Sequence, residues 1–259
     1  DAIDRAVAQV ADSGADCLAI CLIFGFVNPD HERRLRHALH EALPDLHISI
    51  SSDVQPEFRE YERLSTTVLN TYLQPIMGSY LTEFEDQLTK LMPNAELGIN
   101  QSAGGLMTPA RARQLPIRTA LSGPAAGVVG AIDAARSAGL ANVITLDMGG
   151  TSADVCLIRD LEAEVAYDRW IEGYPLRLAS VDVNAVGAGG GSIAWFERDG
   201  LMKVGPQSAG AVPGPACYGH GGTQPTVSDA NLVLGRLSAK GLLGGGMALQ
   251  VDAARASLA

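Results

Sequence analysis

The sequence predicts an α/β protein, and two observations lead to this fold class. Short apolar runs of strand length alternate along the chain with segments whose apolar residues recur at helical spacing. This alternation is typical of parallel sheets flanked by helices. The 259 residues are 47% hydrophobic and 19% charged, a composition that suits one large domain or two modest ones and excludes a disordered or disulfide-stapled chain.

Residues 1–57 are expected to form a βαβ-like unit. A first helix precedes the apolar run Cys17–Phe24, which is predicted to be a buried strand. Pro29 opens a strongly charged helix that continues through Glu41, and Ile48–Ile50 gives a second short strand.

The middle of the chain changes from long helices to shorter elements. Residues 58–92 predict two helices broken near Gln74-Pro75, and residues 96–122 predict short strands and turns. Pro124 then starts, at the N1 position, a helix of small residues. Further strands are expected around 161–168 and 180–186, followed by a Gly/Pro-rich region over 187–225 and a helix over 227–237 that Asp229 caps or supports in its first turn.

The charge balance excludes several classes of partner. Nineteen Lys and Arg against 29 Asp and Glu give a net charge of −10, which argues against nucleic acid and against an anionic membrane surface. No run approaches the ~20 apolar residues that span a bilayer. We therefore expect a cytoplasmic location. The chain starts at Asp1 without Met and stops within a helical pattern, so we expect it to be cut from a longer one.

Neither the cysteines nor the histidines have the spacing of a metal site. Three cysteines lie in apolar runs and are expected to be reduced core thiols, whereas Cys217 lies in a Gly/Pro loop and its role stays open. His37 and His40 share a strongly charged helix face, which is interpreted as solvated, and His220 is interpreted as a surface residue.

The sharpest candidate site is the hairpin predicted over residues 145–158. Between Val143 and Ile158 the only charged side chains are Asp147 and Asp154. A carboxylate at the end of a buried strand is costly unless it is paired, hydrogen-bonded or bound to a metal. Both carboxylates are therefore candidates for a functional role.

The turn of this hairpin has the composition of a phosphate cradle. Gly149 and Gly150 lack Cβ atoms, so their N–H groups can approach an anion closely, and Thr151 and Ser152 add hydroxyl donors. Asp147 would recruit a hydrated Mg²⁺ or orient a water molecule. The same spacing fits an ordinary hairpin with a capping carboxylate equally well.

Longer strings decide between these readings. Ile144–Val155 resembles the second phosphate motif of the superfamily that holds actin, the heat-shock ATPases and the sugar kinases, and Ser122–Ala131 resembles its first connecting helix. Nearly the whole chain is similar to the hydantoinase A/5-oxoprolinase family, which also holds acetone-carboxylase-type subunits. The matching runs are Glu60–Val68, Leu121–Gly127, Gly187–Ser192, Val204–Gly210, Pro213–Tyr218 and Pro225–Asn231.

The resemblance implies an architecture and an activity. The fold would be α/β with actin-like ATPase (ribonuclease H-like) lobes. Residues 1–57 would be the end of the family's N-terminal region, and residues 58–259 a truncated hydantoinase A/oxoprolinase domain. The activity would be ATP-dependent hydrolysis of a cyclic amide such as hydantoin, N-methylhydantoin or 5-oxoproline, through phosphorylation of the carbonyl oxygen. The alternatives are a carboxylase subunit of the acetone or acetophenone type and a non-catalytic nucleotide-binding assembly module.

The resemblance also implies a site, cofactors and partners. ATP and Mg²⁺ would be required, and a hydantoinase B-type subunit or domain is the expected partner, with a homo-oligomer left open. The implied catalytic residues are Asp147, Thr151 and Asp154, with Asp147 also on the metal. The implied nucleotide-binding residues are Gly149, Gly150, Thr151, Ser152, Gly189, Gly190, Gly191 and Ser192.

Two departures from the family pattern matter. The family's first phosphate motif, an Asp-x-Gly-Gly-Thr near its N-terminus, is absent, and so is its later Gly-Gly adenosine loop. The isolated chain is therefore predicted to bind ATP weakly or not at all. In the run Gln101–Gly105, relatives commonly have Asn or Asp where this chain has Ala103, so any role of that side chain toward substrate or metal is in doubt here.

Overall fold

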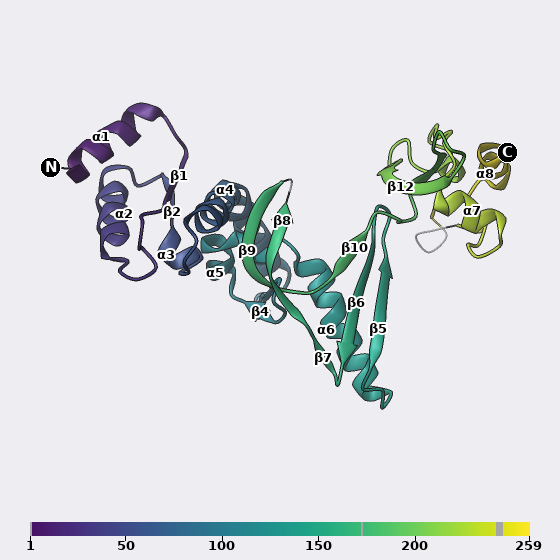
Figure 1. Cartoon of the computed structure of the whole chain (residues 1–259), viewed down its shortest axis with the longest axis horizontal. Coiled ribbons are helices and arrows are strands. Elements are labelled where there is room, and N and C mark those ends of the chain that lie inside the picture. Colours follow the sequence, from purple (N-terminus) through teal and green to yellow (C-terminus); the bar gives the residue numbers. More distant parts are fainter. Residues whose placement is uncertain (1, 172, 242–245) are drawn as a thin grey trace. The chain divides into compact units, whose positions relative to one another are not determined.

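The computed structural model describes residues 2–171, 173–241 and 246–259, which form two compact units (Figure 1). Unit 1 holds the residues up to Gly130 together with Glu164–Asp182, and unit 2 holds Ala131–Ala163 and Val183–Ala259. Helix α6, Ser122–Ser137, contributes residues to both. The division at residues 57 and 58 into family regions stays a prediction.

Unit 1 begins with the predicted βαβ arrangement. Strands β1 (Cys17–Ile20) and β2 (His47–Ile50) pair in parallel, and helix α2 (Asp30–Ala42) connects them. Parallel strands need such a crossover because a tight turn cannot join them. Helix α1 (Ala2–Ser13) precedes the pair, and its Val7 and Val10 pack against a core of Ile20, Leu39 and Ile50.

The first strand is shorter than the sequence predicts. It ends at Ile20, and the rest of the apolar run forms a turn in which Ile23 and Phe24 are 72% and 64% exposed. The cause lies on α2, because the carboxylate of Glu32 accepts the N–H of Leu22 at 2.8 Å. That hydrogen bond takes the place of strand pairing.

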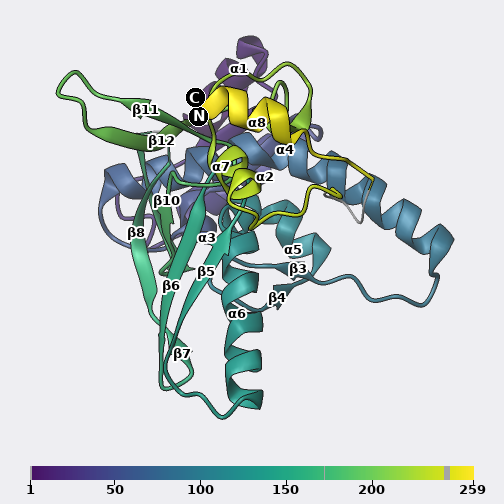
Figure 2. The ribbon, with the colours of Figure 1, turned by 90° about the vertical axis from the view of Figure 1, so that its right-hand side faces the viewer.

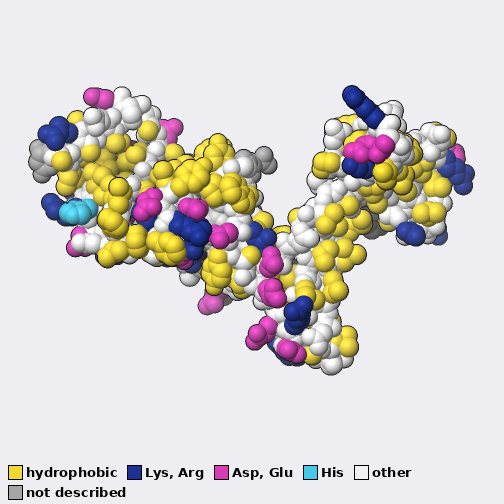
Figure 3. Space-filling model, viewed as in Figure 1, with side chains coloured by type: hydrophobic (Ala, Val, Ile, Leu, Met, Phe, Trp, Pro, Cys, Tyr) yellow, Lys and Arg dark blue, Asp and Glu magenta, His cyan; other side chains and the backbone are white. Residues whose placement is uncertain are grey.

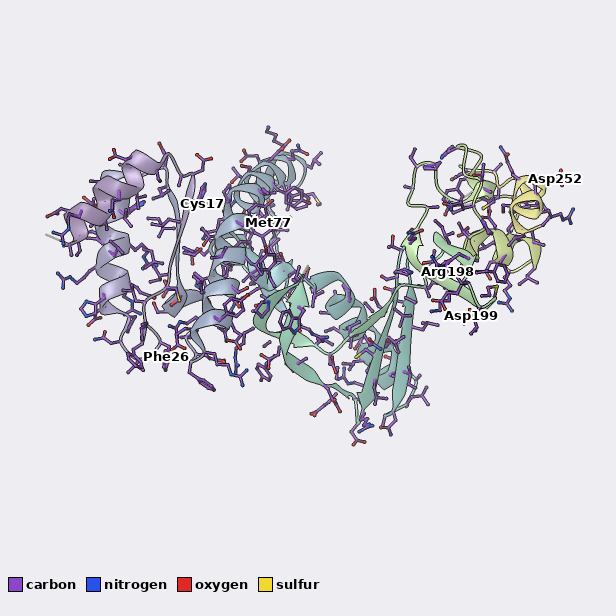
Figure 4. The ribbon with its side chains drawn as sticks, turned by 45° about the horizontal axis from the view of Figure 1, so that its top comes forward. Cys17, Phe26, Met77, Arg198, Asp199 and Asp252 are labelled. Atoms are coloured by element: carbon purple, nitrogen blue, oxygen red, sulfur yellow. The ribbon has the colours of Figure 1, made fainter. Side chains whose placement is uncertain are left out.

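Helix α4 (Glu60–Leu91) runs unbroken through Pro75, so the prediction of two helices was wrong. A proline inside a helix costs roughly 3 kcal/mol. Packing on both sides of the proline offsets this cost, since Leu73 joins one apolar cluster of unit 1 while Met77 and Leu81 join another. Figure 4 shows Met77 on this helix and Cys17 on β1.

Short elements and a long hairpin complete unit 1. Strands β8 (Val165–Ile171) and β9 (Tyr174–Val181) pair antiparallel, and the backbone N–H of Arg177 in β9 donates to Thr66 Oγ1 on α4 at 3.0 Å. The expected strand 180–186 is divided, because Asp182 N–H bonds Glu164 O and ends β9. The remaining elements are α3 (Ser51–Val54), β3 (Ile99–Asn100), β4 (Leu106–Met107), α5 (Pro109–Gln114) and the 3-10 helix η1 (Pro116–Thr119).

Unit 2 is built around a small antiparallel sheet in the order β10–β6–β5. It consists of β5 (Val143–Met148), β6 (Ala153–Arg159), β7 (Glu162–Ala163), which pairs with β6, and β10 (Asn184–Val186). The predicted strand–turn–strand over this hairpin is confirmed. Residues 131–137 of α6 lie beside the end of the sheet where β5 begins (Figures 1 and 2). The helix starts at Ser122, so Pro124 is its third residue and not its first; the first turn tolerates it because those N–H groups lack partners anyway.

The rest of unit 2 packs as a second group of elements. Cys217, Leu232, Leu249 and Ala254 form its apolar cluster. Helix α7 stops at Val233, earlier than predicted, because Gly235 has a φ of +70° and turns the chain. The elements are β11 (Ser192–Phe196), β12 (Met202–Ser208), the 3-10 helix η2 (Ala216–Tyr218), α7 (Val227–Val233) and α8 (Val251–Leu258). Among the described residues of both units, no helix combines the length and apolar character needed to cross a bilayer.

Candidate phosphate site

The β5–β6 hairpin closes in a tight turn over residues 149–152. Its strands pair so that Asp147 lies opposite Asp154 and Met148 opposite Ala153, and Gly149 N–H donates to Ser152 O at 2.9 Å. The two carboxylates therefore stand next to the turn, one on each strand. Gly149, Gly150 and Thr151 are exposed.

A second glycine loop packs directly against this turn. The N–H groups of its three glycines donate to turn carbonyls: Gly189 to Thr151 at 3.2 Å, Gly190 to Gly149 at 2.9 Å and Gly191 to Gly150 at 2.6 Å. A Cβ on Gly189 would stand 2.5 Å from the carbonyl carbon of Thr151, so only glycine fits there. These amides hold the turn, and their contact with a nucleotide stays a prediction. Ser192 joins the same contact through its hydroxyl, which lies 3.3 Å from Thr151 O.

The turn keeps a set of donors that this packing does not use. Within the described residues, the N–H groups of Gly150, Thr151 and Ser152 and the hydroxyls of Thr151 and Ser152 have no hydrogen-bond acceptor. Consecutive free amides in a turn form an anion-binding concavity. The second loop thus binds the carbonyls of the turn and leaves these donors without a protein acceptor among the described residues, while Gly189 also packs close to the backbone nitrogens of Thr151 and Ser152.

The two carboxylates fit a cation. Like charges directly opposite each other on paired strands repel, and neither the Asp147 nor the Asp154 carboxylate has a hydrogen bond or an ion pair within the described part of the chain. Mg²⁺ in proteins usually binds through one or two carboxylates, with water and phosphate oxygens as its other ligands. The two carboxylates of the hairpin match this preference of Mg²⁺. The described residues hold no group of three or more His, Cys, Asp or Glu side chains around one point, so a metal site built from protein ligands alone is not present among them.

One premise of the sequence argument was wrong. Strand β5 is largely exposed, with Ile144 and Leu146 both 72% and Met148 49% exposed, and Asp147 is exposed as well. Hydrophobic side chains accordingly lie along this hairpin in the space-filling view (Figure 3). The reason is that β5 is the edge strand of its sheet, and no element among the described residues covers the face that carries Ile144, Leu146 and Met148. The repulsion between the Asp147 and Asp154 carboxylates across the two strands, and not the burial of either one, is therefore the reason to expect a cation here.

A buried carboxylate on α7, that of Asp229, stabilises the helix start that binds the glycine loop. Asp229 is fully buried and accepts hydrogen bonds from Cys217 N–H at 2.8 Å and from Thr226 N–H and Oγ1 at 3.0 and 2.7 Å. Thr226 and Asp229 form a capping box, so the predicted cap is confirmed. The N–H of Ser228 donates to Gly190 O at 2.8 Å and ties the helix start to the loop. The Thr-x-x-Asp spacing indicates the cap, but no sequence signal indicates the bond to Cys217.

The loop cysteine is structural. Cys217 is fully buried, and burial together with the neighbouring negative charge of Asp229 raises the pKa of its thiol to about 12. A nucleophilic cysteine needs the opposite shift. The expected surface positions of His37, His40 and His220 are confirmed, since all three are exposed.

Comparison with known proteins identifies several relatives. The model of the family described as Hydantoinase/oxoprolinase matches residues 63–259. The chain is 39% identical to the caprolactamase subunit alpha of Pseudomonas jessenii, covering 100% of this chain and 38% of that protein. It is 38% identical to the acetophenone carboxylase gamma subunit of Aromatoleum aromaticum, covering 93% of this chain and 34% of that protein.

A solved structure shows the same fold. The crystal structure of the ATP-dependent caprolactamase from Pseudomonas jessenii superimposes with a TM-score of 0.81 at 38% identity, covering 99% of this chain and 37% of that one. The predicted fold class, α/β with ATPase-like lobes, is confirmed by this match. The chain spans little more than a third of the length of these relatives.

Proposed function

Because this chain belongs to the hydantoinase/oxoprolinase family, we propose that it supplies the phosphate-binding hairpin of an enzyme that hydrolyses a cyclic amide at the expense of ATP. The observation that carries the proposal is the turn over residues 149–152, whose free amides lie beside two carboxylates that have no partner among the residues that the structure describes. Relatives named for caprolactam hydrolysis support the reaction class. A cytoplasmic location belongs to the same proposal.

The chemistry explains why such an enzyme uses ATP. An amide carbonyl is a poor electrophile, and transfer of the terminal phosphoryl group to its oxygen makes the carbonyl carbon reactive. Water then adds at that carbon and the ring C–N bond breaks, which leaves an acyl phosphate, and a second water hydrolyses this acyl phosphate to the carboxylate and phosphate. The protein has to position the groups and stabilise the charge that develops on the transferring phosphoryl oxygens.

Each part of the hairpin has a role in this scheme. The amides of Gly150, Thr151 and Ser152 would bind the phosphoryl oxygens, and the hydroxyls of Thr151 and Ser152 would add donors. Asp147, with Asp154 opposite, would hold the hydrated Mg²⁺ that accompanies ATP. Magnesium neutralises phosphate charge when bound. A partner subunit of the hydantoinase B type completes the proposal, since the relatives are named as subunits.

A second candidate is a carboxylase subunit, in which the activated carbon accepts carbonate in place of water. The acetophenone carboxylase relative, at 38% identity, favours keeping it. Release of ADP in the presence of caprolactam, hydantoin, 5-oxoproline, or acetone plus bicarbonate separates the two functions. Absence of ATP turnover in any longer polypeptide that contains this chain would favour a non-catalytic assembly module.

The decisive substitution is Asp147→Ala in the longest natural polypeptide that contains this chain, assayed with its partner subunit. Loss of a group that stabilises the transferring phosphoryl costs roughly 10²–10³ in rate, and we expect a loss of at least that size. The melting temperature should not fall, because Asp147 is exposed, its side chain has no partner within the described residues, and its loss relieves the repulsion from Asp154. Asp252→Asn is the matched control on α8 of the same unit (Figure 4). Near-normal ATP turnover in the Asp147 variant would remove the assignment.

A further inference from the structure

Unit 1 contains a small polar cavity that the phosphate site does not use. Its volume is about 130 Å³, and its lining comes from three separate stretches of the chain and from both strands of the β8–β9 hairpin. An apolar cavity of ~150 Å³ is enough for benzene. The cavity is therefore the right size for one five- or six-membered ring. The polar residues that line it are Gln55, Glu57, Gln101, Arg118 and Tyr167.

The guanidinium of Arg118 lacks a partner in this cavity. Its Nε atom is buried without a hydrogen bond, and no carboxylate of the described residues lies within ion-pair distance of the side chain. Burial and the positive charge of Arg111 lower the pKa of Arg118. Arginine nevertheless stays charged in proteins, so an acceptor oxygen from a ligand would relieve this group.

The remaining polar side chains add donors and acceptors without adding net charge. Glu57 is neutralised by Arg177, whose Nε lies 2.6 Å from its carboxylate. Gln55 is 8% exposed, and no described residue hydrogen-bonds its side-chain amide. Gln101 donates to Leu106 O at 3.2 Å, which leaves its carbonyl oxygen available. The cavity therefore offers one cation and two amide groups.

A buried serine holds the walls in place. Ser102 is 1% exposed, and both its N–H and its hydroxyl donate to Arg118 O at 2.7 Å. Its carbonyl accepts Val181 N–H at 2.8 Å, and its hydroxyl accepts Leu121 N–H at 3.1 Å. The loop that carries Gln101, the short helix that carries Arg118 and strand β9 are fixed to one residue. A site built in this way is organised before any ligand arrives.

The fourth wall is a β-bulge. Ala166 pairs with Ser180 and Asp168 with Arg177, so Leu178 and Ala179 of β9 together stand opposite the single residue Tyr167 of β8. All three residues of the bulge line the cavity. Bulges re-aim side chains and are over-represented next to functional sites. Leu178, 6% exposed, gives the cavity an apolar wall, and the exposed Tyr167 places an aromatic ring on its lining.

We propose that this cavity binds a small planar ring that carries a carbonyl or carboxylate oxygen, with Arg118 on that oxygen and the amides of Gln55 and Gln101 on the polar edge of the ring. The choice of a cyclic amide among such ligands rests on the proposed function, whereas the site itself does not. The short side chain of Ala103 also lines the cavity and leaves it open. A leucine at position 103 would fill part of the cavity with an apolar side chain.

Protein-observed NMR titration of the present chain, without nucleotide, tests the site. The probes are 5-oxoproline, hydantoin and acetate, which represent a ring with a carboxylate, a neutral ring and a carboxylate without a ring. We expect saturable binding of both rings, with shifts at the side-chain amides of Gln55 and Gln101. Arg118→Met should weaken 5-oxoproline about tenfold or more, because a hydrogen bond to a charged group is lost. Arg111→Met is the charge-matched control and should leave the affinity within about twofold.

A second variant separates shape from charge. Ala103→Leu should abolish binding of the rings and spare acetate, and it carries the test if Arg118→Met fails to fold. Equal affinities in Arg118→Met and Arg111→Met, or no saturable binding of either ring, would overturn the proposal. Because nucleotide is absent throughout, these outcomes are independent of whether Asp147 supports ATP turnover.

Discussion

Two kinds of carboxylate occur in this molecule. Glu32 in unit 1 is fully buried, and its two oxygens accept hydrogen bonds from Leu22 N–H, Ser51 Oγ and Ser52 N–H at 2.7–2.9 Å. Asp147 in unit 2 is exposed and has no protein partner within the described residues. Glu32 finds its hydrogen-bond partners within the protein, whereas the carboxylate of Asp147 depends on water or a ligand for them.

The difference separates architectural from available acids. Burying a carboxylate is tolerated only when its lone pairs are satisfied, so Glu32 and Asp229 each join elements that are distant in sequence. Asp147 and Asp154 instead repel each other across the ladder at the exposed end of a hairpin. A fold keeps such a pair at low cost only where water or a cation meets it. Substitutions at the two kinds of site should therefore affect different measurements.

The largest effect on stability is expected at Asp229. Asp229→Asn puts an amide donor where the carboxylate now accepts several N–H and O–H groups, and stranded buried donors cost about 3 kcal/mol in the free energy of unfolding. Urea unfolding of the chain measures this loss, with Asp252→Asn on exposed α8 as control. Since Ser228 N–H holds Gly190 O, ATP turnover of the longer polypeptide should also fall. An unchanged unfolding midpoint would show that Asp229 is not a structural acid.

A smaller effect is expected at Glu32. Glu32→Gln keeps one acceptor oxygen but places an NH₂ group against either Ser52 N–H or Leu22 N–H, which then loses its acceptor. We expect the free energy of unfolding to fall by about 2 kcal/mol. Hydrogen exchange should accelerate at the amides of Leu22 and Ser52 and stay unchanged in unit 2. Glu41→Gln, on an exposed position of the same helix, is the control. Equal exchange in the two variants would mean that Glu32 is not a structural link.

Sequence reasoning succeeded where the relevant interactions are local. The hairpin predicted over 145–158, the helix after Pro29 and the acid Asp229 in the first turn of α7 all follow from short-range patterns, and the structure has them. The strand pattern could not reveal that one face of β5 is uncovered, because alternation reports apolar side chains and not what packs on them.

The features that sequence reasoning missed depend on long-range packing. Helix α4 continues through Pro75 because two separate clusters hold its halves, and the run after Ile20 turns because Glu32 captures Leu22. The cavity around Arg118 needs a bulge in a hairpin and a serine from another loop, and no single motif encodes either. Partners that lie tens of residues apart leave no periodic signal in one sequence.

The smallest expected effect concerns Cys217. Its thiol is buried in the neutral form next to the structural carboxylate of Asp229. The pKa of its thiol is raised to about 12 from an ordinary value of 9.0, chiefly by burial and then by Asp229. Above pH 9.0 the unfolded chain loses this proton while the folded chain keeps it, so the thiol's contribution to stability is full below pH 9.0 and is lost as the pH rises toward 12. The melting temperature of the wild-type chain should fall more steeply than that of Cys217→Ala over this range. At pH 8 iodoacetamide should modify the partly exposed Cys21 well before Cys217, and equal rates would show that the loop opens and that Asp229 does not seal it.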